Sequence, residues 1–474
     1  MKTLFSILFS VVTLLSFAQF SFDFVIESEE DILINSGIED GYGNYFLSGS
    51  IGDHYTNKYD ALLVKIFPDG SYFTKRFLND KISSRFKELM LINNCKFLAI
   101  GSFGLDSNNW YTNYFWDCEI DTGLNVISEN SFRIDYLSSS IEPLYTLIDY
   151  QENVIVAGQA YYYPNPQSDL FFARLNQQGD SLLVKVHQIP SGQSVRGMAE
   201  NTNGSGYSFV GKGLGYFSIT HYSTTDSVFN IITTTDFETE LGLPSLGPWL
   251  TDSTFLCSGT DGYDNEDKND EYIHVMIVDT LGVIHKELAL DKPGIDDYSA
   301  WKYSNAYVND TTIYLGGFTN PGMWVTYPNL IELYLIDANL NLLGYKEFSG
   351  NEHYNLMGIE PTSDGGCLLY AWVYNNPNSY QERDLRVIKV LRSDINLITT
   401  VETIQPKELS AEVYPNPAEF ELSISIELLK HYKEIILQIY STSGKKITDR
   451  KLTGVGNVIK INVSNLLSGT YFFK

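Results

Sequence analysis

The chain has 474 residues, with 58 acidic and 32 basic side chains and a net charge of −26. This acidity disfavours nucleic acid and anionic membrane surfaces as partners, because both repel a negatively charged protein. Hydrophobic residues make up 43% of the chain and include 33 Tyr and 27 Phe, which excludes general disorder and favours an ordered, β-rich fold.

The N-terminus has the pattern of a secretory signal peptide. Lys2 gives a short positive start, and residues 4–17 form a predominantly apolar run. Ser16 and Ala18 are the small residues that a cleavage site requires, so we expect removal of residues 1–18. A membrane anchor is the alternative, but the run is shorter than a spanning helix, and no later stretch approaches about 18 uninterrupted apolar residues.

Residues 19–401 contain a repeat. A short apolar strand ends in small residues seven times, at steps of 48–57 residues, and the last residues of this signature are Gly49, Gly101, Gly158, Gly211, Gly259, Gly316 and Ala371. Further alternating strands and DG, QG or LG turns surround each signature. Seven units of four strands and about 50 residues predict an all-β fold, a seven-bladed β-propeller.

Other architectures fit this repeat less well. A sandwich of this size would exceed the usual single domain, and solenoid repeats are shorter and more regular. Amphipathic helical segments are missing between the strands, which argues against βα units. To close the ring, we expect residues 22–26 to pair as the fourth strand of the seventh blade, with residues 396–402 as competitors for that place.

Four cysteines are too few to form a disulfide scaffold in an exported protein of this size. Cys95 and Cys118 fall in two segments that we expect to be neighbouring strands, and whether they form a disulfide stays open. Cys257 and Cys367 are expected to be buried as small hydrophobic residues.

Catalytic motifs are missing from the sequence. It contains no HExxH, GxSxG, GxxxxGK[ST] or CxxC pattern, and its seven histidines are scattered. We therefore predict no catalytic residue and no cofactor. Calcium is the one ion considered, because the stretch DGYDNEDKND (261–270) brings together Asp261, Asp264, Asp267 and Asp270. A solvated hairpin tip is the alternative, since the order of residues does not match a calcium-loop consensus.

Aromatic residues occur in the loops that follow the second strand of six units. These loops are expected to emerge on one face of the propeller, and the candidate ligand-binding residues are Trp110, Tyr111, Tyr161, Tyr162, Tyr163, Trp324, Tyr327, Tyr374 and Tyr380, with Tyr55 and Tyr263 in similar positions. Rings among Asn, Pro and Thr suit saccharide stacking or a protein hot spot. Packing of the rings between adjacent blades is the alternative.

The C-terminal region differs from the rest of the chain. A polar linker, residues 402–410, precedes it, and residues 411–474 carry about +2 charges while the preceding residues carry −28. Alternating strands are predicted at 420–426, 434–440, 445–452, 457–463 and 469–474, which together make a small β-sandwich.

This tail resembles a known family. VYPNPA (413–418), whose two prolines stiffen an extended segment, is followed by IYSTSGKKI (439–447) and INVSNLLSGTYFFK (461–474). In this order the motifs are similar to the type A C-terminal sorting domain of substrates of the type IX secretion system in Bacteroidetes. The sorting motif would comprise Tyr414, Pro415, Asn416, Pro417, Gly444 and Gly469. Family members usually add another short strand beyond the one equivalent to residues 469–474.

The resemblance implies a partner and a location. Residues 411–474 would contact the type IX secretion machinery, and the protein would pass through the periplasm to the outer cell surface or be secreted. We expect a monomeric, non-catalytic binding module for an unknown glycan or protein. The alternative is a propeller enzyme acting on polysaccharide, a lyase or a glycosidase.

Overall fold

The chain divides into two compact units, Met1–Ile398 and Thr399–Lys474, which are described separately. The predicted signal peptide and linker lie outside the described residues. The computed structural model describes residues 20–53, 55–56, 58–77, 83–93, 95–104, 113–133, 140–161, 168–188, 193–213, 220–237, 241–262, 271–292, 294–321, 329–374, 383–398, 411–414, 420–426, 434–441, 446–453, 458–464, 466 and 469–473.

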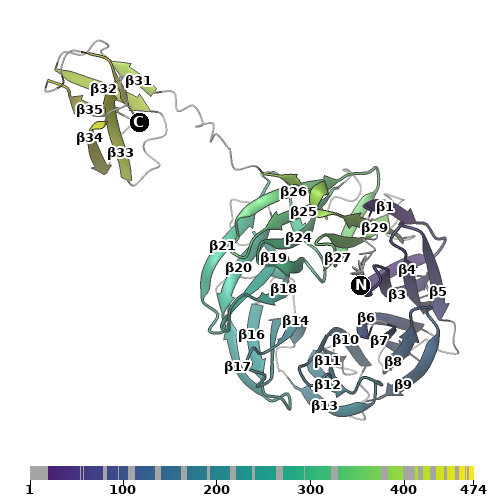
Figure 1. Ribbon diagram of the computed structural model, residues 1–474. Coiled ribbons are helices and arrows are strands. Elements are labelled where there is room, and N and C mark those ends of the chain that lie inside the picture. Colours follow the sequence, from purple (N-terminus) through teal and green to yellow (C-terminus); the bar gives the residue numbers. More distant parts are fainter. Residues whose placement is uncertain are drawn as a thin grey trace, which may run out of the picture. The chain divides into compact units, whose positions relative to one another are not determined.

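Strands β1–β30 of the first unit form seven antiparallel sheets among the described residues, and these sheets surround a common centre (Figure 1). This ring of mostly four-stranded sheets is a β-propeller. The sheets are, in chain order, sheet 1 with β2 (Asp31–Glu39), β3 (Tyr45–Asp53), β4 (Lys58–Ile66) and β5 (Tyr72–Phe77); sheet 2 with β6 (Ser83–Asn93), β7 (Lys96–Gly104), β8 (Asn113–Asp121) and β9 (Val126–Phe132); sheet 3 with β10 (Ser140–Ile148), β11 (Val154–Tyr161), β12 (Ser168–Leu175) and β13 (Ser181–His187); sheet 4 with β14 (Gln193–Glu200), β15 (Tyr207–Gly213), β16 (Thr220–Thr225) and β17 (Ile231–Asp236); sheet 5 with β18 (Gly242–Trp249), β19 (Thr254–Asp261), β20 (Tyr272–Asp279) and β21 (Ile284–Leu290); sheet 6 with β22 (Asp297–Ser299), β23 (Asn305–Asn309), β24 (Thr312–Thr319), β25 (Ile331–Ile336), β26 (Leu342–Phe348) and β30 (Asn396–Leu397); and sheet 7 with β27 (His353–Pro361), β28 (Cys367–Tyr374), β29 (Arg383–Val390) and β1 (Phe22–Ile26).

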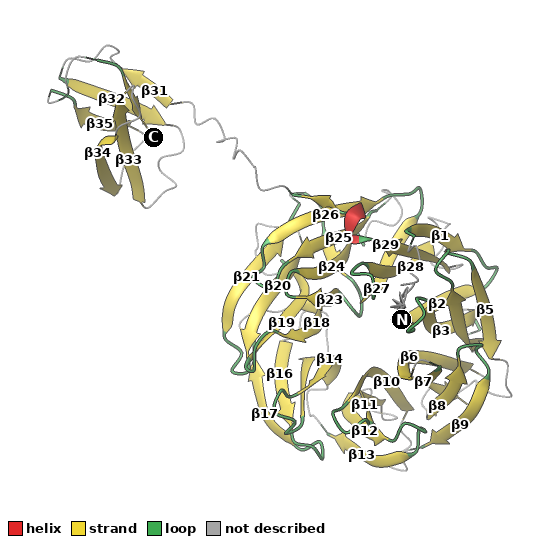
Figure 2. Ribbon diagram, in the orientation of Figure 1, coloured by secondary structure: helices red, strands yellow, loops and turns green. Residues whose placement is uncertain are grey.

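Helical structure is nearly absent from the described residues. Figure 2 shows a single helical turn, η1 (Arg392–Asp394), among strands. Within the described ranges, no helix is long and apolar enough to cross a membrane.

The ring closes through the N-terminal strand. β1 pairs antiparallel with β29, with Phe22 opposite Lys389 and Ile26 opposite Leu385. Phe24 also stacks on Tyr72 of sheet 1 at 5.3 Å, so β1 joins the last sheet to the first. The predicted closing strand is therefore confirmed, and its competitor, β30, pairs with β26 instead.

The small-residue signature has a steric cause. A Cβ atom on Gly49, Gly101 or Gly158 would lie about 2 Å from a carbonyl oxygen of the neighbouring inner strand (2.0, 1.9 and 2.1 Å). Just beyond that carbonyl, the inner strand contains an extra residue, as between Ile34 and Ser36 and between Phe86 and Glu88. Such β-bulges bend a strand and re-aim its side chains, and here they bring the inner strand against the glycine.

The cysteines do not form a disulfide in the described residues. Cys95 is exposed in the turn between β6 and β7, so it is not in a strand as expected, while Cys118 is buried in β8 opposite Ala99. Cys257 and Cys367 are buried, as predicted.

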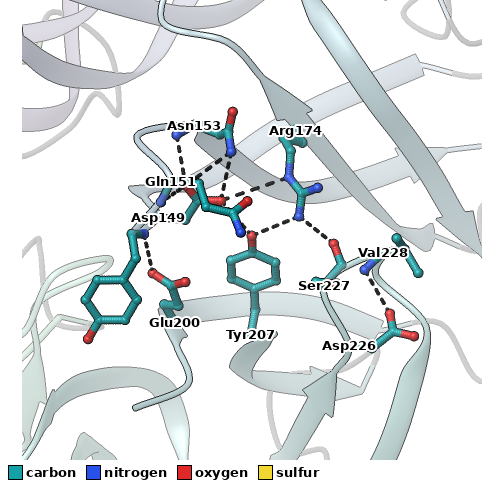
Figure 3. Close-up of polar contacts among 10 residues, drawn as sticks. Asp149, Gln151, Asn153, Arg174, Glu200, Tyr207, Asp226, Ser227 and Val228 are labelled. Carbon is teal, nitrogen blue, oxygen red and sulfur yellow. Dashed lines mark hydrogen bonds and ion pairs between the residues drawn. The ribbon is translucent and has the colours of Figure 1, made fainter. Parts of the chain in front are cut away.

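A polar turn within one sheet forms hydrogen bonds with the neighbouring sheet. In the turn between β10 and β11, Asp149 accepts backbone hydrogen bonds from Gln151 (2.9 Å) and Asn153 (2.8 Å). The hydroxyl of Tyr207 from sheet 4 donates to the other Asp149 oxygen at 3.0 Å and accepts from Arg174 at 3.1 Å (Figure 3). This chain of hydrogen bonds links sheet 3 to sheet 4.

The second unit contains two three-stranded sheets. All five predicted strands are confirmed, and one strand, β31, precedes them. One sheet has the order β31-β32-β35 and the other β34-β33-β36, with β31 (Ala411–Tyr414), β32 (Glu421–Ile426), β33 (Glu434–Ser441), β34 (Lys446–Thr453), β35 (Val458–Asn462) and β36 (Tyr471–Phe473).

The hydroxyl bridge between sheets 3 and 4 yields a stability prediction. Tyr207 is 2% exposed, so Tyr207→Phe should lower the free energy of unfolding by about 1–3 kcal/mol, because the buried Asp149 oxygen and Arg174 both lose a partner. Chemical denaturation measures this change. The control is Tyr150→Phe in the same turn, because Tyr150 is 75% exposed; equal stability of the two variants would contradict the bridging role.

Candidate functional site

The topology assigns the predicted binding loops to one end of the propeller. Because neighbouring strands alternate in direction, the segments after each second strand and the segments between consecutive sheets emerge at the same end, called here the loop face. Most predicted site residues lie outside the described ranges: Trp110, Tyr111, Tyr162, Tyr163, Tyr263, Trp324, Tyr327, Tyr380, Asp264, Asp267, Asp270, Pro415, Asn416, Pro417 and Gly444.

The described members of the predicted sites have different environments. Tyr55 is 74% exposed, whereas Tyr374 is 6% exposed and accepts a hydrogen bond from the Asn355 amide at 3.4 Å. Tyr161 is the last residue of β11. Tyr374 thus lies within the sheet packing, and Tyr55 alone of the three is known to be open to solvent.

The predicted calcium loop is described only at its start. Asp261 accepts from its neighbour Gly262 at 2.7 Å and pairs with His274 Nδ1 at 2.9 Å. Among the described residues, no group of three or more His, Cys, Asp or Glu side chains is arranged to hold a metal ion. In the tail, Tyr414 and Gly469 are exposed.

The structure adds a site in the centre of the ring that was not among the predicted residues. The inner strand of sheet 6 is broken into β22 and β23, and residues 300–304, called here the crossing segment, lie between them. The crossing segment runs beside β27, because Lys302 N–H donates to Met357 O at 3.0 Å and Ile359 N–H donates to Tyr303 O at 3.0 Å. Its middle part therefore pairs with sheet 7, while Ala300 and Ser304 at its ends keep backbone hydrogen bonds to Gly316 of their own sheet.

Two side chains of the crossing segment meet Glu88 of β6, more than 200 positions away in sequence. The hydroxyl of Tyr303 lies 2.8 Å from both carboxylate oxygens of Glu88, and the ammonium group of Lys302 forms an ion pair with the same carboxylate. Thr146 of β10 adds a hydrogen bond of 3.3 Å. Side chains from sheets 2, 3 and 6 thus converge on one carboxylate.

The bulge in β6 completes this cluster. Lys87 is the extra residue, and its carbonyl accepts a hydrogen bond from the Lys302 ammonium group at 2.9 Å. Lys302 also lies over the rings of Tyr145 (5.4 Å) and Tyr303 (5.1 Å). A lysine held by a carboxylate, a carbonyl and two ring faces has its charge compensated without water.

Burial is the main cause of the pKa shifts of Glu88 and Lys302. Burial raises the pKa of Glu88 and lowers the pKa of Lys302, and the attraction between the two groups opposes both shifts. Glu88 is only 2% exposed. Because its oxygens already accept from donors of this chain, Glu88 holds the sheets together across the channel and offers little to a ligand.

A cavity of about 400 Å³ adjoins this cluster. It is lined by both polar and apolar residues, which are Ser36, Gly37, Glu88, Thr146, Tyr303 and Glu360 and Ile38, Leu89, Met90, Leu91 and Ile148. A Cβ atom on Gly37 would lie 2.9 Å from Leu47 and 3.3 Å from Glu360. Glycine therefore allows Glu360 to approach the inner strand of sheet 1.

Glu360 is the titratable group of this cavity. Tyr370 donates a hydrogen bond to Glu360 at 3.3 Å. Burial, and next the negative charge of Glu88, raise the pKa of Glu360 to about 8. At neutral pH Glu360 is therefore mostly a protonated carboxylic acid, which can donate a hydrogen bond to a ligand oxygen or transfer a proton to it.

One sequence signal points to this site. The span from the start of β22 to the end of β23 covers residues 297–309, whereas the inner strand of sheet 7 covers nine residues. The longer span of sheet 6 contains the crossing segment, within SAWKYSN (299–305). No sequence motif marks Glu88 and Glu360, because each is preceded and followed by residues that are typical of any inner strand.

The raised pKa of Glu360 predicts a pH dependence of stability. The folded state retains this proton up to about pH 8, while the unfolded state releases it near pH 4.5, so wild-type stability falls between these values as pH rises. Glu360→Gln should be more stable than wild type by several kcal/mol at pH 8, at about 1.4 kcal/mol per pKa unit, and show no such gain at pH 4. Denaturation series at several pH values test this, with exposed Glu29→Gln as the control; a difference independent of pH would contradict the assignment.

Solved structures match the chain with low sequence identity and low TM-scores. The Dos1 propeller has 11% identity and a TM-score of 0.41, with 78% of this chain and 95% of that chain covered. The β-propeller domain of the Trilobed protease from Pyrococcus furiosus has 10% identity and a TM-score of 0.39, covering 78% and 98%. The uncomplexed acylaminoacyl peptidase from Pyrococcus horikoshii has 10% identity and a TM-score of 0.43, covering 84% and 59%. At these scores the propeller assignment rests on the sheet order and not on the similarities.

The tail gives the specific match. None of the curated proteins compared with the chain matches it, but residues 412–474 match the family model described as a secretion system C-terminal sorting domain. This confirms that VYPNPA and the motifs after it belong to a sorting domain. Residues 412–474 are thus a sorting domain of the type IX secretion system, which directs the protein to the cell surface or the medium.

Proposed function

We propose that this chain is an exported seven-bladed propeller that acts outside the cell as a non-catalytic binding module. In this proposal, a type A sorting domain follows the propeller, as in Bacteroidetes proteins. Residues 1–18 direct the chain into the periplasm, residues 402–410 link the two parts, and residues 411–474 contact the secretion machinery. The alternating strands of the tail and the match to the sorting-domain family support the export steps.

Each of the seven sheets would be one blade, and the two sheets of the tail would pack as a sandwich. The pairing of β1 with β29 supports a closed ring, because it builds the last sheet from both ends of the propeller sequence. A ring closed within one chain needs no second copy, so we propose a monomer.

The cavity beside Glu360 is the observation that carries the binding proposal. Its volume of about 400 Å³ lies in the range of small-molecule sites. The protonated Glu360 and the hydroxyl of Ser36 can exchange hydrogen bonds with a polyhydroxylated ligand, and apolar side chains such as Ile148 also line the cavity. This combination suits one unit of a glycan.

The same carboxyl group favours one alternative function. A glutamic acid that remains protonated near neutral pH is what a general acid requires, so a polysaccharide-active enzyme, a lyase or glycosidase, is the second candidate. Glycosidases use a second carboxylate as base or nucleophile. Glu88 is the nearest such group in the cluster, and its hydrogen bonds to Lys302 and Tyr303 argue for a structural role.

Ligand binding can be tested with a variant that fills the cavity. Ile148 lines the cavity and is 40% exposed, so Ile148→Trp should occupy the space without overpacking the core. After a glycan-array screen of the full chain, calorimetry should show at least about a tenfold loss of affinity in this variant, about 1.4 kcal/mol.

The matched control is Ile127→Trp on β9, where Ile127 is 48% exposed. Equal affinities of both variants and wild type would place the ligand elsewhere. Glu360→Gln separates the alternative: an enzyme releases products from the bound glycan and stops when the acid is removed, whereas a binding module releases none.

Export can be tested by deletion of residues 411–474. The shortened chain should fold, because the first unit is compact by itself, but it should accumulate in the periplasm. Cell fractionation with immunoblotting measures its location, and a thermal melt of the purified protein checks its folding. Normal amounts of the folded, shortened chain at the cell surface would contradict the role of the tail.

A further inference from the structure

Two arginines lie where sheets 1, 2 and 7 meet at the loop face. Arg85 is near the start of β6, and Arg383 is the first residue of β29. Sheets 7, 1 and 2 follow one another in the ring (Figure 1). Because inner strands begin at the loop face and β29, a third strand, also begins there, both arginines lie at that end of the propeller.

Aromatic rings hold both guanidinium groups. The guanidinium carbon of Arg85 lies 4.3 Å from the centre of the Tyr59 ring, and that of Arg383 lies 5.2 Å from the Trp372 ring. Tyr59 is 3% exposed, so it is a fixed platform. Stacking uses the face of the guanidinium plane and leaves its N–H groups, which lie in that plane, for hydrogen bonds.

The nearest carboxylates are engaged elsewhere. Asp31 pairs with Arg383 through its side chain at 2.8 Å and accepts from the backbone N–H of Arg383 at 2.9 Å. Glu142 forms an ion pair with Lys87 at 2.6 Å. Within the part of the chain that the structure describes, no carboxylate forms an ion pair with Arg85.

Arg85 is therefore a stacked cation that no carboxylate of the described residues holds in an ion pair. Arg85 is half-buried. Burial lowers its pKa, the charges of Tyr59 and Glu142 oppose this shift, and the like charge of Arg383 adds to it. Most cations in a chain with 26 excess negative charges can find a carboxylate. Leaving one stacked and half-buried without such a partner costs solvation free energy that an incoming anion would recover.

We propose that Arg85 binds an anionic oxygen group of a saccharide ligand at the loop face, with Arg383 adding charge and Tyr59 and Trp372 forming the aromatic walls. A carboxylate or a sulfate group matches the in-plane donors of arginine and makes strong, charge-assisted hydrogen bonds. The proposal rests on the proposed binding function for its saccharide carrier. It is a second contact, because Arg85 lies near the start of an inner strand whereas the cavity beside Glu360 is lined by residues farther along the inner strands. It specifies the ligand as one with an isolated uronate or sulfate group, because the acidic protein repels a polyanion.

Binding of small probes to the full chain tests the site. Calorimetry and thermal melts would use glucuronate, inorganic sulfate and glucose. We expect glucuronate and sulfate to bind at least about tenfold more tightly than glucose, with affinity falling as salt rises. Arg85→Gln should abolish this preference, and Arg85→Lys should retain part of it, because lysine keeps the charge but loses the planar pair of donors.

The matched control is Arg76→Gln on β5. Because Arg76 already pairs with Glu30 and Asp60, this substitution should leave the anion affinity unchanged. If Arg85→Gln is poorly folded, the Arg85→Lys comparison still decides the question. Equal affinity of wild type for glucuronate and glucose, or anion binding unchanged in both Arg85 variants, would overturn the proposal.

The outcome can be separated from that of the general binding function. Neutral glycans that bind and respond to Ile148→Trp, without any anion preference, would remove the arginine site and leave the binding function intact. If Arg85 binds the small anions but no glycan binds, the arginine site would remain as a site for a free oxyanion. The proposal that a saccharide carries the anionic group would then be wrong.

Discussion

The ladder between Phe22–Ile26 and Leu385–Lys389 joins segments separated by almost the whole propeller. Each sheet packs mainly against its two neighbours, so the ring has a defined diameter only when its last sheet is tied to its first. Phe24 on Tyr72 and the pair of Arg386 with Asp23 (2.8 Å) strengthen that tie. Every contact across the channel depends on it, because an open ring would let the sheets spread apart.

The interior of the channel shows what closure makes possible. Lys302 and Tyr303 reach Glu88 only because sheets 6 and 2 are held at a constant separation. A buried ion pair contributes little net stability compared with apolar packing, but it tolerates few alternative arrangements. The crossing segment thus makes the centre of the ring rigid and forms one wall of the cavity beside Glu360, where the same lack of solvent keeps a carboxyl group protonated.

Glycine has a recurring role in this architecture. The signature that revealed the repeat marks the points at which a second strand passes within van der Waals distance of a bulged inner strand, as at Gly49 and Gly101. Side chains bond to carbonyl groups at the bulge of β6: Asn35 donates to Phe86 O at 2.9 Å and Lys302 donates to Lys87 O at 2.9 Å. The same local irregularity therefore creates both the sequence repeat and the polar lining of the channel.

The sequence by itself determined the features that depend on local pattern. Alternation with period two, turn residues and the recurring glycine predict a propeller. VYPNPA with the motifs after it predicts the sorting tail. Both predictions are possible because these patterns lie in residues close together in the sequence. The tertiary structure alone decided the convergence of Glu88, Lys302 and Glu360 and the stacking of Arg85 on Tyr59. These residues come from different sheets, and their distances depend on how the sheets pack around the ring, which no pattern of neighbouring residues encodes.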